Sequence, residues 1–106
     1  MAQKEVIRLI KKFLARLSKE GISIKQTYLY GSYASGKAGN DSDIDVMLIS
    51  DFFDKNDDAQ AGKVWRIGKN VDARIEPYIV GMKRFKEDTI SPLLRIIKKE
   101  GLKIQA

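Results

Sequence analysis

The sequence predicts an α/β fold, in which helices alternate with strands. Residues 4–20 carry apolar side chains at helical spacing, residues 44–50 are almost continuously apolar, and residues 71–78 alternate apolar and polar side chains. These patterns are typical of an amphipathic helix, a strand covered on both faces and a half-buried strand, respectively. With 106 residues, 43% of them hydrophobic, we expect one folded domain over residues 1–106.

The N-terminal part predicts a helix, a strand and a second short helix. The apolar stripe of residues 4–20 consists of Val6, Ile10, Phe13, Leu14 and Leu17. Gly21 ends this helix. Residues 24–30 are rich in aromatic and β-branched side chains, which favours a strand. Ser32 is a suitable N-cap for a short helix over residues 32–36.

The middle of the chain predicts a central strand followed by a polar segment. Only Asp45 interrupts the apolar run of residues 44–50. A carboxylate inside a buried strand is unfavourable unless it is paired or binds a metal, so Asp45 requires an explanation. Residues 51–62 are rich in Asp and predict a mobile loop, with a helix from about Asp58 to Ile67.

The C-terminal part predicts a third strand, two helices and a short final strand. The third strand covers residues 71–78, and Pro77 fits only at a strand end or at a sheet edge. A short helix follows over residues 82–88. A second helix over residues 91–101 begins with a Ser-Pro cap and ends at a glycine, and residues 102–104 complete the chain as a strand.

The composition excludes several kinds of functional site. The chain contains no cysteine and no histidine, which excludes disulfides, thiolate or imidazole zinc sites and histidine-dependent nucleophiles. Metal chemistry therefore depends on carboxylates, which favour Mg²⁺ or Mn²⁺. The N-terminus has no apolar signal core and no segment is long enough to span a membrane, so we expect a cytoplasmic protein.

Charge is distributed unevenly along the chain. Residues 41–58 hold seven Asp against Lys55 alone, a local charge of −6. Since the whole chain carries +6, the remainder carries +12. A basic body around an acidic segment suits a polyanion bridged by metal, a nucleic acid or an acidic protein. The alternative is that the basic residues only solvate helix faces.

The most informative motif is Gly31-Ser32 followed, after ten residues, by Asp43-Ile44-Asp45. A glycine–serine turn lets backbone amides approach a phosphate, and an Asp-x-Asp pair can hold a divalent metal on that phosphate. The motif therefore combines phosphate binding and metal binding within fifteen residues.

Two other motifs fit this segment less well. Asp41, Asp43 and Asp45 match three ligands of a calcium-binding EF-hand loop, but Val46 and Phe52 replace its glycine and its glutamate. Residues 31–38 match a P-loop except at the last position, where alanine replaces the metal-binding hydroxyl. A turn also follows this segment where a P-loop requires a helix.

The Gly-Ser, ten-residue and Asp-x-Asp spacing resembles that of the minimal nucleotidyltransferases, within the polymerase-beta-like nucleotidyltransferase superfamily. The flanking residues agree with this resemblance: Tyr30, Ala34, Gly36 and Ser42. It extends from the opening helix through the third strand. The resemblance implies a short mixed sheet flanked by helices, and transfer of a nucleoside monophosphate from an NTP to a hydroxyl acceptor.

The resemblance also implies which carboxylates are catalytic. Asp43 and Asp45 would be catalytic metal ligands, joined by a third carboxylate from a neighbouring strand. We assign that third position to Asp72, with Glu76 as the second choice. The alternative for Asp72 is a surface acid paired with Arg74.

Together these carboxylates would hold two Mg²⁺ or Mn²⁺ ions on the NTP substrate, for which ATP is the expected choice. Gly31 and Ser32 would bind the terminal phosphates. Lys37 and Arg74 are candidate counter-charges for phosphate or base. The alternative for Lys37 is a solvated loop lysine.

The resemblance further implies a protein partner. Larger members of the superfamily carry an additional domain for the acceptor, which we do not expect in 106 residues. Minimal members act beside helical HEPN proteins as the antitoxin of a toxin–antitoxin pair, so we expect nucleotide transfer to such a partner and a possible homo- or hetero-oligomer. One alternative is a non-catalytic nucleotide-binding module that neutralises its partner by contact. Another is a nucleic-acid-binding protein, although no recognition motif supports it.

Overall fold

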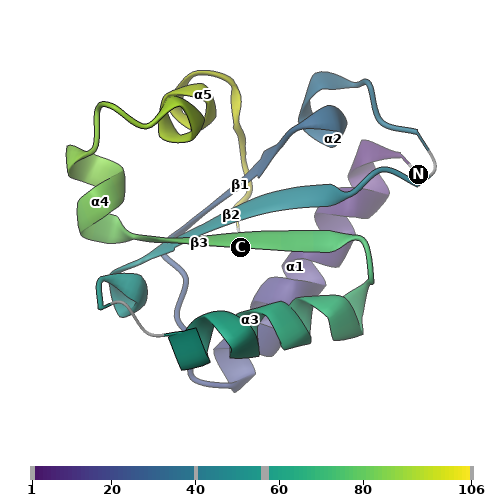
Figure 1. Ribbon diagram of the computed structural model, residues 1–106. Coiled ribbons are helices and arrows are strands. Elements are labelled where there is room, and N and C mark those ends of the chain that lie inside the picture. Colours follow the sequence, from purple (N-terminus) through teal and green to yellow (C-terminus); the bar gives the residue numbers. More distant parts are fainter. Residues whose placement is uncertain (1, 40, 56–57, 106) are drawn as a thin grey trace.

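The computed structural model describes residues 2–39, 41–55 and 58–105. Its four strands are β1 (Gln26–Tyr30), β2 (Ile44–Ser50), β3 (Ile75–Gly81) and β4 (Leu102–Lys103). They form one sheet in the order β3-β2-β1-β4, in which β1 runs antiparallel to β2 and β4 while β2 runs parallel to β3 (Figure 1). The predicted α/β fold with a short mixed sheet is confirmed. Asn40, Asp57 and the two ends of the predicted domain, Met1 and Ala106, lie outside the described residues.

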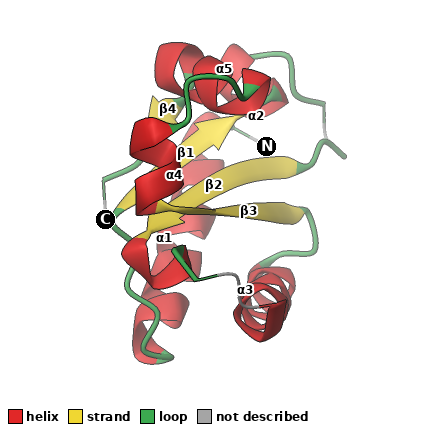
Figure 2. Ribbon diagram, turned by 60° about the vertical axis from the view of Figure 1, so that its left-hand side comes forward, coloured by secondary structure: helices red, strands yellow, loops and turns green. Residues whose placement is uncertain are grey.

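Helices cover both faces of the sheet. They are α1 (Gln3–Lys19), α2 (Ser32–Ser35), α3 (Asp58–Val71), α4 (Met82–Glu87) and α5 (Pro92–Glu100), with a short 3₁₀ helix η1 (Asp51–Phe53) after β2. Helices α1 and α3 lie on one face, and α4 and α5 on the other (Figures 1 and 2). Among the described helices, none has the length and apolar character needed to cross a membrane.

The central strand β2 separates two hydrophobic clusters. Val46 and Leu48 face the cluster formed with α1 and α3, whereas Met47 and Ile49 face the cluster formed with α4 and α5. All four side chains are fully buried. This alternation confirms that β2 is covered on both faces, as its apolar run predicts.

The boundary between α3 and β3 differs from the prediction. Helix α3 begins at Asp58, as predicted, but continues past Ile67 to Val71, so the third strand begins at Ile75 instead of Val71. The side chain of Asp72 explains the difference, because its Oδ1 accepts the backbone N–H of Arg74 at 2.9 Å and closes a turn. The alternation of residues 71–74 therefore belongs to a helix end and a turn.

Pro77 lies in β3, the edge strand beside β2. The N–H of Ile44 donates to the carbonyl of Arg74 at 2.7 Å. In a parallel pair, alternate residues of each strand direct their backbone N–H and C=O groups toward the partner strand. Arg74, Glu76 and Tyr78 therefore face β2, whereas the backbone of Pro77 points away from it. A proline at this position removes no hydrogen bond from the sheet. The predicted placement of Pro77 at a sheet edge is confirmed.

Candidate active site

A row of polar side chains crosses the sheet where β1 ends and where β2 and β3 begin. Tyr30, Asp45 and Glu76 occupy adjacent positions in the strand register. Asp43 precedes Asp45 by two residues, so it projects to the same face of the sheet. The fold thus brings the carboxylates of Asp45 and Glu76 and the phenol of Tyr30 together on the face that carries α4 and α5, with Asp43 close to Asp45. We refer to these four residues as the acidic row.

Burial and neighbouring negative charges raise the pKa of Asp45 and of the Tyr30 phenol. The pKa of Asp45 is raised, first by burial and then by the negative charges of Asp43 and Glu76. Burial also raises the pKa of Tyr30 to about 12, with further contributions from Asp45, Tyr78 and Glu76. A cation at this position would relieve the repulsion that both shifts report.

Gly31 forms the turn that joins β1 to the acidic row. Its backbone has φ = 73° and ψ = −148°, a region that essentially only glycine adopts. A Cβ atom built on Gly31 would collide with Oδ2 of Asp45. Glycine is therefore required both for the turn and for the place of the carboxylate.

Two hydrogen bonds anchor α2 and the loop that leads to β2. Gln3 Nε2 donates to the carbonyl of Tyr33 at 2.9 Å, which ties α2 to α1. The backbone N–H of Gly39 donates to Ser42 Oγ at 2.8 Å and closes the loop before Asp43. Tyr33 is buried beneath these contacts. No local pattern predicts the role of Gln3, since its partner lies thirty residues away.

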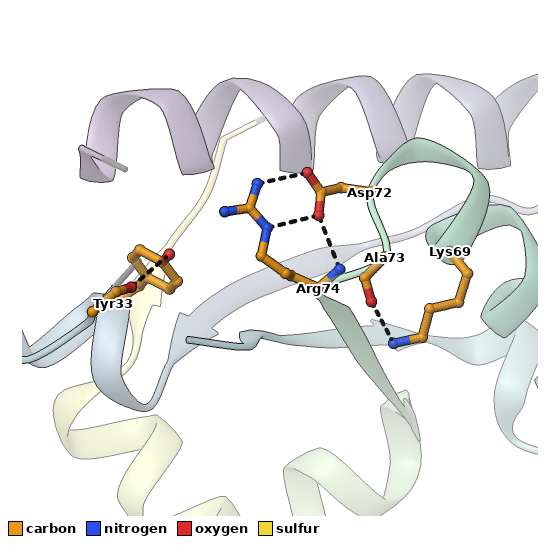
Figure 3. Close-up of polar contacts among 6 residues, drawn as sticks. Tyr33, Lys69, Asp72, Ala73 and Arg74 are labelled. Carbon is orange, nitrogen blue, oxygen red and sulfur yellow. Dashed lines mark hydrogen bonds and ion pairs between the residues drawn. The ribbon is translucent and has the colours of Figure 1, made fainter. Parts of the chain in front are cut away.

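Asp72 lies with Arg74, as Figure 3 shows. Arg74 Nε donates to Oδ1 at 2.9 Å and Nη2 donates to Oδ2 at 2.8 Å. These hydrogen bonds lower the pKa of Asp72. The residue occupies the turn before β3, outside the row of Tyr30, Asp45 and Glu76. This pairing is the arrangement that the sequence left open as the alternative for Asp72.

Glu76 lies in the row and is paired with a lysine. Lys69 Nζ donates to Glu76 Oε1 at 2.9 Å. It also donates to the carbonyl of Ala73 at 3.0 Å (Figure 3). The same ammonium lies 4.3 Å from the ring centroid of Trp65. Sequence reasoning missed Lys69, although a basic residue in the last turn of α3 is placed to reach the strand that follows.

The other predicted site residues lie around α2. Ser32 is half-buried as the first residue of this helix, directly after Gly31, and Lys37 is exposed in the loop that follows. β2 includes Asp45, which is incompatible with an EF-hand loop. Within the described segments, no helix follows Lys37 before β2, which is incompatible with a P-loop.

The donor set fits a hard divalent cation. Carboxylate oxygens are the ligands that Mg²⁺ and Mn²⁺ prefer, and Asp43, Asp45 and Glu76 supply them on one face. Among the described residues, no group of three acidic side chains is already arranged around a cation position. Glu76 is paired with Lys69, whose ammonium lies 2.9 Å from its carboxylate.

A separate cavity lies at the opposite end of the sheet. It measures about 550 Å³ and its lining includes Asp54, Gly81, Lys83 and Arg84. None of the residues predicted for catalysis lines this cavity. Perturbed carboxylates mark functional sites more specifically than volume does, so the acidic row is the better candidate.

Comparisons with known proteins agree with this geometry. A family model described as "Nucleotidyltransferase domain" matches residues 7–104. The crystal structure of a candidate nucleotidyltransferase from Sulfolobus solfataricus superposes with a TM-score of 0.67 at 17% identity, covering 95% of this chain and 80% of that one. A mutant of the toxin–antitoxin MntA–HpeT superposes with a TM-score of 0.56 at 17% identity, covering 100% and 74%. No curated protein gives a significant match.

Proposed function

Because the chain belongs to the nucleotidyltransferase domain family, we propose that it transfers a nucleoside monophosphate, AMP from ATP by preference, to a hydroxyl group of a protein partner. The observation that carries this proposal is the placement of Asp45 against Gly31 and beside Glu76. The turn proposed to bind phosphate, Asp45 of the Asp-x-Asp pair and a carboxylate from the neighbouring strand are then adjacent to one another.

The proposed reaction is a displacement at the α-phosphorus. The acceptor oxygen forms a bond to that phosphorus, the bond to the oxygen bridging the α- and β-phosphates breaks, and pyrophosphate leaves. The hydroxyl proton passes to a carboxylate of the site. Two Mg²⁺ or Mn²⁺ ions would neutralise the triphosphate and increase the acidity of the acceptor hydroxyl. Asp43 and Asp45 would hold these ions, and Gly31 with Ser32 would bind the terminal phosphates.

We assign the third carboxylate to Glu76 and retain Asp72 as the candidate to be tested against it. Glu76 is the register partner of Asp45, whereas Asp72 is held in the preceding turn by Arg74. In this proposal Lys69 balances the charge of Glu76 in the free protein and releases it when a cation binds.

The two basic candidates have different proposed roles. Lys37 is exposed on a loop beside the phosphate-binding turn and can follow the triphosphate as it enters. Arg74 is restrained by Asp72 and contributes a fixed positive charge.

The acceptor is proposed to lie on a second protein. The similarity to a toxin–antitoxin structure supports a helical HEPN-type partner, with this chain as the antitoxin. The proposal includes a cytoplasmic location, where ATP is available as the substrate.

The test follows each phosphate of the substrate separately. The chain is incubated with Mg²⁺, a co-purified partner and ATP labelled either at the α- or at the γ-phosphate. We expect the α-label to appear on the partner and the γ-label to appear only in pyrophosphate. Asp43→Asn and Asp45→Asn should each reduce transfer at least a hundredfold, whereas Asp51→Asn, at the opposite end of β2, should retain it. Transfer that persists in both site variants would contradict the proposal.

The same assay assigns the third carboxylate. If Glu76 holds the metal, Glu76→Gln lowers transfer as severely as Asp45→Asn does, and Asp72→Asn lowers it less than about tenfold. The reverse order would assign the position to Asp72.

One observation favours a second candidate function. Both candidates for the third carboxylate are paired with a basic side chain, which suits a nucleotide-binding module without catalysis. Such a module would neutralise its partner by contact, and neutralisation would then survive Asp43→Asn and Asp45→Asn.

A further inference from the structure

A cavity of about 350 Å³ opens between α2 and α5, on the face of the sheet that carries the acidic row. Helix α2 lies at the end of β1, and α5 lies on the face of the sheet that carries α4 (Figures 1 and 2). Tyr30 and Gly31 line this cavity and also border Asp45, so the cavity is continuous with the proposed active site. Its volume lies in the range of small-molecule sites.

The walls of the cavity offer apolar surface to a ligand. Tyr30 contributes from the end of β1, Ala34 from α2 and Ile96 from α5. Ile96 leaves 50% of its surface exposed, which is unusual for an isoleucine that faces a cavity. A flat apolar ligand would cover this side chain and the ring of Tyr30 together.

The charge of the cavity determines which part of a nucleotide it accepts. Of the described residues that line it, only Glu100 is charged, and its charge is negative. A triphosphate is repelled there, whereas a group with N–H donors is attracted. Ser32 and Lys37, the residues proposed for the phosphates, are outside the lining of this cavity.

We propose that this cavity binds the base of the NTP, with Glu100 accepting a hydrogen bond from an exocyclic amine. Adenine, guanine and cytosine each carry such an amine. Uracil carries only a ring N–H between two carbonyl oxygens, which a carboxylate repels. The inference rests on the proposed function, because it takes the triphosphate to lie at the acidic row.

Nucleotide binding in the absence of a partner tests this assignment. Dissociation constants for the Mg²⁺ complexes of ATP, GTP, CTP, UTP and tripolyphosphate are measured by titration calorimetry. We expect each nucleotide with an amino group to bind about tenfold tighter than UTP, the effect of one charged hydrogen bond. Glu100→Gln should reduce that preference to less than about threefold, because an amide both donates and accepts. Glu87→Gln, an exposed acid outside this cavity, is the matched control.

The Ile96→Ser variant distinguishes binding of the base from binding of the phosphates. It should weaken every NTP at least threefold and leave the affinity for tripolyphosphate unchanged, since only the base contacts this wall. An unchanged preference over UTP in Glu100→Gln, or equal weakening of tripolyphosphate in Ile96→Ser, would overturn the base site. Transfer that depends on Asp45 would still stand in that case. Conversely, selective NTP binding without any transfer would support the cavity and contradict the transferase.

Discussion

The contact between Gly31 and Asp45 shows how tightly single residues determine this site. The carboxylate occupies the space into which a side chain at position 31 would project. The same glycine adopts a conformation closed to other residues. The turn proposed to bind phosphate and the strand that carries Asp45 are therefore coupled through one pair of residues.

Alanine substitutions at two glycines distinguish the cost of backbone strain from the cost of a steric clash with Asp45. Gly31 and Gly36 both have positive φ values, 73° and 77°, but a Cβ at Gly36 meets nothing within 4 Å. We expect Gly36→Ala to lower the free energy of unfolding by about 1 kcal/mol. Gly31→Ala should lower it by more than about 2 kcal/mol and abolish transfer, because Asp45 must also move. Urea unfolding and the transfer assay measure the two effects.

Two aspartates should change stability in opposite directions. The pKa of Asp45 is raised in the folded state, so its contribution to stability is largest below its unfolded pKa and is lost as the pH rises through the folded value. Without metal at pH 7, Asp45→Asn should therefore raise the free energy of unfolding, by less than about 1 kcal/mol.

The pKa of Asp72 is lowered, so its contribution is present above its unfolded pKa and is lost as the pH falls through the folded value. Asp72→Asn should lower the free energy of unfolding at pH 7 by less than about 1 kcal/mol. That difference should vanish in acid. Urea unfolding of both variants from pH 3 to 8 would contradict this assignment if the two effects had the same sign.

Tyr30 reports the charge of the acidic row spectroscopically. In the metal-free protein its phenol should titrate at about 12, above the ordinary value of 10.0, because burial and the neighbouring carboxylates disfavour the phenolate. Asp45→Asn should lower the pKa of Tyr30, since it removes the largest of the charges that raise it. Phenolate absorbance measures both values, with Tyr30→Phe identifying the signal. Equal titration in wild type and Asp45→Asn would show that the two groups do not interact.

At the scale of elements, most of the fold could be predicted from the sequence. Periodicity located α1, β2 and α5 within a residue or two, because each buries a continuous face in the core. The end of α3 could not be predicted, because alternation over residues 71–78 reads equally as strand. The hydrogen bond from the backbone of Arg74 to Asp72 decides that local conformation.

The candidate site was predictable to a similar extent. Gly31, Asp43 and Asp45 follow from a motif that is local in sequence. The pairing of Asp45 with Glu76 depends on the register between β2 and β3, which no local pattern specifies. The contact of Lys69 with Glu76 depends in turn on where α3 ends.

Gly68 of α3 permits close packing between this helix and two neighbouring elements. A Cβ there would lie 3.2 Å from Ile75 Cγ2 and 3.3 Å from Phe13 Cζ, so the glycine lets α3 approach both α1 and β3. We expect Gly68→Val to lower the free energy of unfolding by about 1–3 kcal/mol through overpacking. Gly62→Ala in the same helix meets only the end of Arg66 and should raise it by up to about 1 kcal/mol. Thermal unfolding of the two variants measures these changes. If Gly68→Val also stabilised the protein, the core around Gly68 would be shown to rearrange and accept the larger side chain.

At the scale of the whole molecule, cation binding should stabilise the fold. The carboxylates of the acidic row repel one another in the free protein. A ligand present at ten times its dissociation constant raises the free energy of unfolding by about 1.4 kcal/mol. Mg²⁺ should therefore raise the melting temperature of the wild type and of Asp51→Asn, but not that of Asp43→Asn. Calorimetry with and without a chelator measures this. An equal rise in all three proteins would indicate only general screening of charge.

Pro77 has a consequence for how the protein resists self-association. An open strand edge is the usual template on which identical chains add to one another and aggregate. β3 is such an edge strand. Pro77, next to Glu76, lacks a backbone N–H and therefore interrupts the series of N–H groups that point away from β2. We therefore expect regular edge-to-edge stacking to be disfavoured beside the candidate site, even at high concentration. We also expect the proposed protein partner to reach this site over the face of the sheet, where no strand pairing is needed.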